Sequence, residues 1–151
     1  MSSTQTVVVE REVRVSASPE TIFPFLIDPE KIVRWKGTEA MLDPRPGGIY
    51  RVNVAGKHMA RGEFVEVNPN SKVVFTWGWE GNDDVPPGSS TVEVSLIPDG
   101  DETIVRLRHT DLPTQESAAE HTMGWNHYMG RLAVAAPGGD PGEDPMISMD
   151  M

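Results

Sequence analysis

The most informative stretch of the chain is residues 114–138, which read TQESAAEHTMGWNHYMGRLAVAAPG. Thr114 is a typical N-cap, and Glu116 falls in the first turn, where the helix dipole favours an acidic side chain. Residues on one side of this segment recur at steps of three and four, so they share one helix face. They are Ala118, His121, Trp125, Tyr128, Leu132 and Ala135. The spacing predicts a long amphipathic helix over residues 115–136, ended by the proline and glycines that follow.

The chain ahead of this segment consists mainly of short alternating patterns that are typical of strands. The first covers residues 7–15. Ser18-Pro19 and Asp28-Pro29 follow it and predict two short helices, because each pair supplies an N-cap and a proline at the first helical position. Six further strand patterns are separated by turns rich in Gly, Pro, Asn and Asp. They cover approximately residues 38–42, 49–54, 58–67, 73–79, 92–96 and 103–109.

These elements predict an α+β domain built on one curved antiparallel sheet of about six to seven strands. One face of such a sheet is apolar and needs a cover, and the helix at 115–136 is the only element long enough to supply it. A helix held against a curved sheet leaves space between the two unless large side chains fill it. We expect this domain over residues 1–137. Residues 138–151 combine Gly, Pro and acidic side chains and are expected to form a disordered acidic tail.

The composition limits the functions that are open to the chain. Its 151 residues suffice for one domain, and the absence of cysteine excludes disulfides, thiol nucleophiles and cysteine-ligated metal sites. A net charge of −10 is poorly suited to binding nucleic acid or anionic lipid. No phosphate-binding glycine motif, HExxH or GxSxG is present, so we expect no cofactor and no metal. Without an apolar run of membrane-spanning length or a signal sequence, the expected location is the cytoplasm.

Several motifs occur in an order that resembles a known family. They are Arg11-x-Val13-x-Val15-x-Ala17-x-Pro19-Glu20, Asp28-Pro29 with Trp35, Pro46-Gly47-Gly48-x-Tyr50, Val74-Phe75-Thr76-Trp77, Thr103-x-Val105-x-Leu107-x-His109, and Gly124-Trp125-x-x-Tyr128-Met129. This set is similar to the START-like (SRPBCC) superfamily, and more narrowly to the family named after the activator of the heat-shock chaperone ATPase, which includes a calicheamicin-resistance protein. The resemblance covers about residues 7–136 and implies a helix-grip fold with a ligand-sized cavity. The superfamily hosts transport, cyclase, hydrolase, chaperone-cofactor and sequestration roles, so the fold alone does not specify the function.

Large aromatic side chains from several segments are expected to face the interior. Such rings commonly line ligand pockets, although they can equally form a filled core. His109 and His121 should face the same space, where they could hold a polar ligand group, act as acid and base, or be core histidines bonded to backbone carbonyls. The expected pocket residues are Trp35, Tyr50, Phe75, Trp77, His109, His121, Trp125 and Tyr128, with Met41, Met59 and Met129 as adaptable lining.

One charged residue falls on the apolar side of the first strand pattern. Arg11 there predicts either an ion pair with Glu63 or Glu66, or a cavity cation that holds an anionic ligand. The remaining histidines, His58 and His127, are expected to be peripheral.

Three functions fit these observations. The first, which we favour, is binding of a hydrophobic or aromatic small molecule, because no catalytic constellation is evident. The second is a cyclase- or hydrolase-like enzyme acting on an aromatic or polyketide-like compound, with His109, Arg11 and Tyr50 as its polar groups. The third is a co-chaperone-like domain with a chaperone partner. The oligomeric state is left open.

Overall fold

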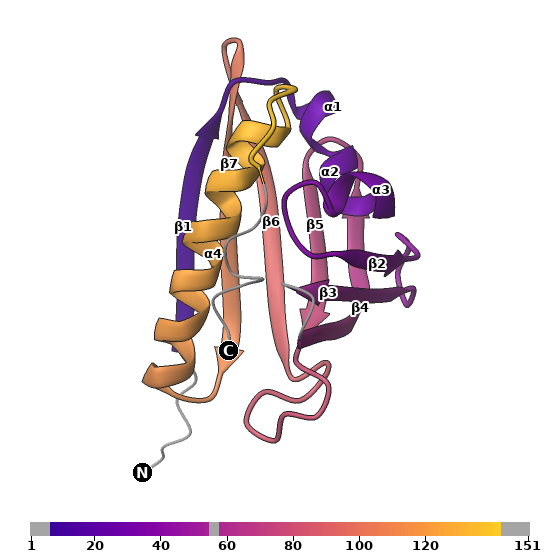
Figure 1. Cartoon of the computed structure of the whole chain (residues 1–151), viewed down its shortest axis with the longest axis vertical. Coiled ribbons are helices and arrows are strands. Elements are labelled where there is room, and N and C mark those ends of the chain that lie inside the picture. Colours follow the sequence, from indigo (N-terminus) through magenta and orange to yellow (C-terminus); the bar gives the residue numbers. More distant parts are fainter. Residues whose placement is uncertain (1–6, 55–57, 143–151) are drawn as a thin grey trace.

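The computed structural model describes residues 7–54 and 58–142 and shows a sheet with helices on one face (Figure 1). The elements, in chain order, are β1 (Val7–Val15), α1 (Pro19–Ile22), α2 (Pro24–Ile27), α3 (Pro29–Ile32), β2 (Glu39–Leu42), β3 (Ile49–Val54), β4 (His58–Asn68), β5 (Lys72–Trp77), β6 (Ser90–Asp99), β7 (Glu102–Leu112) and α4 (Gln115–Ala135). No helix in these two ranges is both long enough and apolar enough to cross a membrane.

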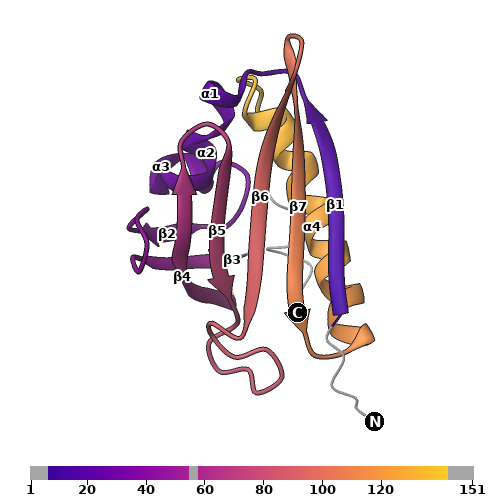
Figure 2. The ribbon, with the colours of Figure 1, turned by 180° about the vertical axis from the view of Figure 1, so that it is seen from behind.

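The sheet has seven strands in the order β1-β7-β6-β5-β4-β3-β2, and every neighbouring pair is antiparallel. From β2 to β7 it is a simple meander, and β1 joins the far edge beside β7. The long helix α4 lies along one face, whereas the view from behind shows strands with no described helix in front of them (Figure 2). The predicted α+β class, the antiparallel sheet and its covering helix are therefore confirmed.

The face of α4 that packs on the sheet is the one that the sequence predicts. All six residues of the three-and-four pattern are buried, with Leu132 only 1% exposed. Thr114 is the N-cap, and its hydroxyl accepts a hydrogen bond from the backbone N–H of Ser117 at 3.0 Å. A capped helix with one apolar face obtains its stability from packing, which places its aromatic residues against the sheet.

The segment between β1 and β2 holds three short helices, where the sequence analysis expected two. The expected first helix is divided at Phe23, because Pro24 has no N–H to continue the backbone ladder and instead begins a new turn. The caps expected at Ser18 and Asp28 are present, and each side chain accepts from a backbone N–H in the first turn of its helix.

Strand β4 bends so that its first half pairs with β3 and its second half with β5. The register shifts between Phe64 and Glu66, so the irregularity lies just after Gly62. Gly62 itself is needed for a close approach, because a Cβ there would lie 1.9 Å from the carbonyl oxygen of Thr76. This bend curves the sheet around the space that α4 covers.

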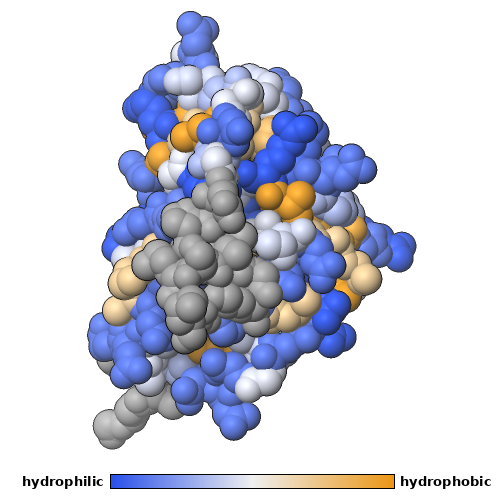
Figure 3. Space-filling view, viewed as in Figure 1, coloured by the Kyte–Doolittle hydropathy of each residue, from blue (hydrophilic) through white to orange (hydrophobic). Residues whose placement is uncertain are grey.

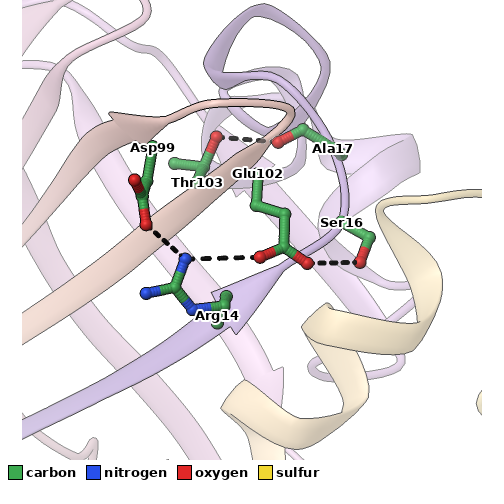
Figure 4. A network of polar contacts seen from close by, with 6 residues as sticks. All are labelled: Arg14, Ser16, Ala17, Asp99, Glu102 and Thr103. Atoms are coloured by element: carbon green, nitrogen blue, oxygen red, sulfur yellow. Dashed lines mark hydrogen bonds and ion pairs between the residues drawn. The ribbon is translucent and has the colours of Figure 1, made fainter.

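The end of β1 is tied to the β6–β7 hairpin by a polar network (Figure 4). Arg14 contacts Asp99 and Glu102, and Glu102 also accepts from Ser16 at 3.1 Å. Thr103 donates to the carbonyl of Ala17 at 2.7 Å. The ion pairs of Arg14 are half exposed and contribute little to stability, whereas Thr103 is buried, so its hydrogen bond anchors the chain as it enters α1.

Arg11 does not occupy the interior position that its place in the pattern predicted. It is exposed and donates to the carbonyl of Glu10 at 2.7 Å. Both expected roles of Arg11, the ion pair with an inward carboxylate and the cavity cation, are therefore wrong. The physical reason is that β1 is an edge strand. No strand lies beside its outer edge, so a long side chain there can reach solvent.

The chain beyond α4 turns back toward its own helix as far as residue 142. Arg131 donates to the carbonyls of Pro141 at 3.3 Å and Gly142 at 3.0 Å, and also to the carbonyl of Trp35 at 3.1 Å. The first residues of the expected tail therefore make defined hydrogen bonds. The rest of that tail, residues 143–151, lies outside the described residues.

Candidate functional site

A cavity of about 720 Å³ lies between α4 and the adjoining ends of β3, β4 and β5. We call it the tryptophan cavity, because three indole rings line it. Its lining residues are Lys36, Val54, His58, Trp77, Trp79, Glu80, Gly81, Asn82, Glu120, His121, Met123, Gly124, Trp125 and Tyr128. The volume falls in the range of about 300–1,000 Å³ that small-molecule sites occupy.

One wall of the tryptophan cavity is held by His121 of α4. Its Nε2 accepts hydrogen bonds from the indole N–H of Trp77 at 3.3 Å and of Trp79 at 3.2 Å. Its Nδ1 lies 2.8 Å from the carbonyl oxygen of Ser117, one turn earlier in the helix, so Nδ1 carries the proton and donates it. The neutral imidazole thus fixes two tryptophan rings from β5 and the following loop.

Trp79 is positioned by the loop between β5 and β6. Its backbone N–H donates to the carbonyl of Val85 at 2.7 Å, and the next N–H, of Glu80, donates to Met59 at 2.9 Å. The hydrogen bond from Trp79 to Val85 joins two parts of the loop, and the side chain of Val85 is buried. The backbone that carries the indole of Trp79 is therefore fixed by hydrogen bonds to two other segments.

A second histidine lies beside the first, because the ring centroids of His109 and His121 are 4.9 Å apart. The Nδ1 of His109 accepts from the indole N–H of Trp125 at 3.1 Å, and its Nε2 lies 2.8 Å from the hydroxyl of Ser90. Ser90 donates to the carbonyl of Trp77, so its oxygen remains free to accept from His109. The ring is fully enclosed and neutral, and it acts as a spacer that sets the angle of Trp125.

Burial lowers the pKa of both histidines. For His109 the pKa falls to about 3, mainly because the charged ring would lose its solvation, and secondarily because His121 and Lys36 would repel it. For His121 burial again lowers the pKa, while the hydrogen bond to Ser117 and the charge of Glu120 act in the opposite direction. Both rings are therefore neutral near pH 7.

The low pKa of His109 predicts a loss of stability in mild acid. Below about pH 6.5 this histidine is protonated in the unfolded chain but stays neutral in the folded chain. The free energy of unfolding therefore falls by about 1.4 kcal/mol per pH unit. We expect this group to lower the free energy of unfolding by about 2 kcal/mol from pH 7 to pH 5, measured by urea denaturation. His109→Gln should lose less over the same interval. An equal loss in both proteins would contradict the assignment.

The most unusual group at the site is Lys36, which the sequence analysis did not single out. It is only 2% exposed, and its Nζ lies 2.6 Å from the phenol oxygen of Tyr50. Five aromatic rings surround Nζ, with centroids at 4.7–5.7 Å: those of Trp35, Tyr50, Phe75, Trp77 and Trp125. Burial lowers the pKa of Lys36 to about 7 and raises that of Tyr50 far above its usual value, so the phenol stays protonated.

The eight residues expected to form a pocket divide into three groups. Trp77, His121, Trp125 and Tyr128 line the tryptophan cavity. Trp35, Tyr50 and Phe75 lie deeper, beside a void of about 20 Å³, roughly the room of one water molecule, which Trp125 also borders. His109 contacts neither space directly and acts through Trp125.

Some lining residues were missed or misplaced. Trp79, His58 and Lys36 belong to the lining, although His58 was expected to be peripheral. Trp79 continues the alternation of β5, and that signal was available. Met41, expected as lining, is 56% exposed on the edge strand β2. Among the described residues, no cluster of three or more His, Asp or Glu side chains is arranged to hold a metal ion.

Comparisons with known proteins agree with this architecture. The family model for "Activator of Hsp90 ATPase homolog 1-like protein" matches residues 16–136. The solution NMR structure of an AHSA1-like protein from Rhizobium etli is 50% identical, covers 93% of this chain and 88% of that chain, and superimposes with a TM-score of 0.75. The comparison with curated proteins gives no match.

Two more distant structures share the fold. DynU16, from the dynemicin biosynthetic locus, is 23% identical with a TM-score of 0.78, and the match covers 91% of this chain and 49% of that one. An Hsp90 activator from Plasmodium falciparum is 23% identical with a TM-score of 0.69, covering 84% of this chain and 94% of that one. The family match and the 50% identical relative confirm the resemblance seen in the motifs. The chain belongs to the Activator of Hsp90 ATPase homolog 1-like family and has its helix-grip fold.

Proposed function

We propose that this protein binds a hydrophobic or aromatic small molecule in the tryptophan cavity. The observation that carries the proposal is the cavity itself: about 720 Å³, with the rings of Trp77, Trp79, Trp125 and Tyr128 on its walls. Rings held at fixed angles by His109 and His121 give an apolar surface that is formed before the ligand arrives. Such preorganisation reduces the entropy lost on binding.

An enzymatic role has less support from the geometry. The polar groups considered for it were His109, Arg11 and Tyr50. Arg11 is exposed, and His109 is enclosed behind Trp125 with both ring nitrogens engaged. The phenol of Tyr50 is buried against Lys36, with its pKa raised. These three groups do not converge on one reacting atom.

A chaperone-linked role is suggested by the family name and by the Plasmodium falciparum activator. It would require an exposed surface that recognises a partner protein. The large exposed hydrophobic residues of the described chain are spread over β1, β2, β4 and α4: Val8, Met41, Val65, Met123 and Val134. On the face that carries α4, the coloured atoms are mainly hydrophilic, with apolar residues in small separate groups (Figure 3). We therefore rank this role below ligand binding.

The test uses a neutral fluorescent probe, N-phenyl-1-naphthylamine, and two matched glycine substitutions on α4. Gly124 lines the tryptophan cavity and Gly130 is exposed, and a Cβ at either position meets no atom within 4 Å. Gly124→Leu should fill part of the cavity, whereas Gly130→Leu adds the same side chain outside it. Both replace glycine inside a helix, which favours helix formation.

We expect saturable probe fluorescence with the wild type and with Gly130→Leu. Gly124→Leu should weaken binding about tenfold or more, which corresponds to at least about 1.4 kcal/mol. Urea denaturation should show that both variants remain folded. Signal that does not saturate, or equal affinity in all three proteins, would overturn the proposed function.

A further inference from the structure

Lys36 is held at the inner end of the tryptophan cavity by the backbone on either side of it. Its backbone N–H donates to the carbonyl of Ile32, the last residue of α3, at 2.9 Å. Gly37 follows with a φ of +88°, and a Cβ there would lie 2.6 Å from Val52 and 2.8 Å from the carbonyl of Asn53. Only glycine allows this approach to β3, and it directs the lysine side chain inward.

The charge of Lys36 has no counterion among the described residues. An ammonium group offers three hydrogen-bond donors, and one of them is used by the phenol oxygen of Tyr50. Burial alone accounts for the lowered pKa, with no contribution from a nearby acidic group. Burying a charge without a partner carries a large desolvation penalty. An anion that bound at Nζ would offset much of that penalty.

The surrounding rings lower the cost of the charge without removing it. Their centroids lie at 4.7 Å for Trp125 and 5.0 Å for Trp77, distances at which the ring faces attract a cation. These two rings, and Lys36 itself, also line the tryptophan cavity. An aromatic ligand that stacks on Trp77 and Trp125 therefore brings its substituents next to Nζ.

The other titratable groups around the cavity leave Lys36 as its available cation. His121 and His109 are held neutral by burial, and Tyr50 stays protonated. On the rim, Glu80 is bound by Arg51 at 2.9 Å and Arg61 at 3.7 Å. Two further titratable side chains, His58 and Glu120, are exposed at the same rim. Lys36 is the only lysine or arginine among the described lining residues.

We propose that the ligand of the tryptophan cavity is an aromatic carboxylate, with its ring between the tryptophans and its carboxylate bound by the Nζ of Lys36. This inference rests on the proposed function and specifies the chemical class of the ligand. The carboxylate supplies the missing counterion and accepts the two remaining N–H groups. The aromatic ring of the ligand occupies the volume of the tryptophan cavity.

The inference predicts that binding is coupled to proton uptake. Lys36 has a pKa of about 7 in the free protein, so at pH 8 most molecules carry a neutral amine. A bound carboxylate favours the ammonium form, and the pKa must therefore rise on binding. Affinity should be greatest below pH 7 and should fall by up to about tenfold per pH unit above it, while the lysine of the bound state remains charged.

The experiment compares 2-naphthoate with 2-naphthamide, which have similar shape but differ in charge. Isothermal titration calorimetry at pH 8, in phosphate and in Tris, measures the protons taken up through the different ionisation enthalpies of the buffers. We expect the wild type to bind naphthoate about tenfold or more tightly than naphthamide at pH 6.5, and to take up nearly one proton with naphthoate at pH 8. Naphthamide should bind without proton uptake.

Two lysine variants separate the site from the overall charge. Lys36→Met should remove both the preference for naphthoate and the proton uptake. Lys31→Met also removes one positive charge, but from a residue of α3 that does not line the cavity. It should leave the preference for naphthoate and the proton uptake unchanged. The proton uptake of the wild type tests the inference even if Lys36→Met does not fold.

The outcomes distinguish this inference from the proposed function. Equal affinity for the two compounds, or naphthoate binding without proton uptake, would overturn the carboxylate assignment. If neither compound binds while N-phenyl-1-naphthylamine binds and Gly124→Leu blocks it, the carboxylate assignment fails and the proposed function stands. Failure of the neutral probe as well would overturn both.

Discussion

Trp125→Ala is expected to lower the free energy of unfolding by about 3–5 kcal/mol, the range observed when a large buried aromatic side chain is truncated. Trp125 is 4% exposed, and its ring lies 5.2 Å from that of Trp77. The substitution also leaves the Nδ1 of His109 without its donor. Loss of packing and loss of a buried hydrogen bond therefore add, and urea denaturation at pH 7 measures their sum.

Two further substitutions serve as controls for Trp125→Ala. Trp125→Phe keeps an aromatic ring and removes the N–H, so it should retain the fold and cost less than the alanine change. Met123→Ala changes a residue that also lines the cavity but is 70% exposed, and its effect should stay within about 0.5 kcal/mol. A loss for Trp125→Ala as small as that for Met123→Ala would contradict the placement of Trp125 between sheet and helix.

The wild-type protein should become more stable as the pH is raised from 7 toward 9.5. Lys36 has a pKa of about 7 when folded and about 10.5 when unfolded. Between these values the unfolded chain binds the additional proton, so the free energy of unfolding rises with pH. The expected gain is about 3 kcal/mol by pH 9.5, measured by urea denaturation at several pH values.

Lys36→Met removes the titrating group while retaining an unbranched side chain. Its stability should change much less over the same pH interval. The comparison is made below pH 10 because the raised pKa of Tyr50 reverses the trend at higher pH, where the unfolded chain loses its phenol proton first. Parallel curves for the two proteins would show that Lys36 is not buried as a titrating group.

Periodic features were predictable from the sequence because many residues report on each of them. The buried face of α4 follows from six residues at steps of three and four, from Ala118 to Ala135. The antiparallel strands follow from alternation and from the turn residues between them. The aromatic rings of Trp77 and Trp125 were placed in the interior for the same reason.

Single residues whose position depends on tertiary structure were not predictable in this way. Arg11 fits the buried side of a strand pattern, but β1 is an edge strand and the side chain reaches solvent. Lys36 belongs to no periodic pattern, and its burial results from the contact of Gly37 with β3. Charge alone suggests a surface position, which is the usual place for lysine. The inward position of Trp77, His121, Trp125 and Tyr128 beside the cavity was thus predictable, whereas the buried amine of Lys36 was not.

The hydrogen bonds of the indole rings have a consequence for selectivity. His121 and His109 already engage the N–H groups of Trp77, Trp79 and Trp125, so these rings offer a guest only carbon surface. Dispersion and hydrophobic contact depend on area and shape, and they tolerate changes in a ring skeleton that directional hydrogen bonds would reject. We therefore expect a congener series with one, two or three fused rings to be graded by size, with no abrupt exclusion of any single scaffold.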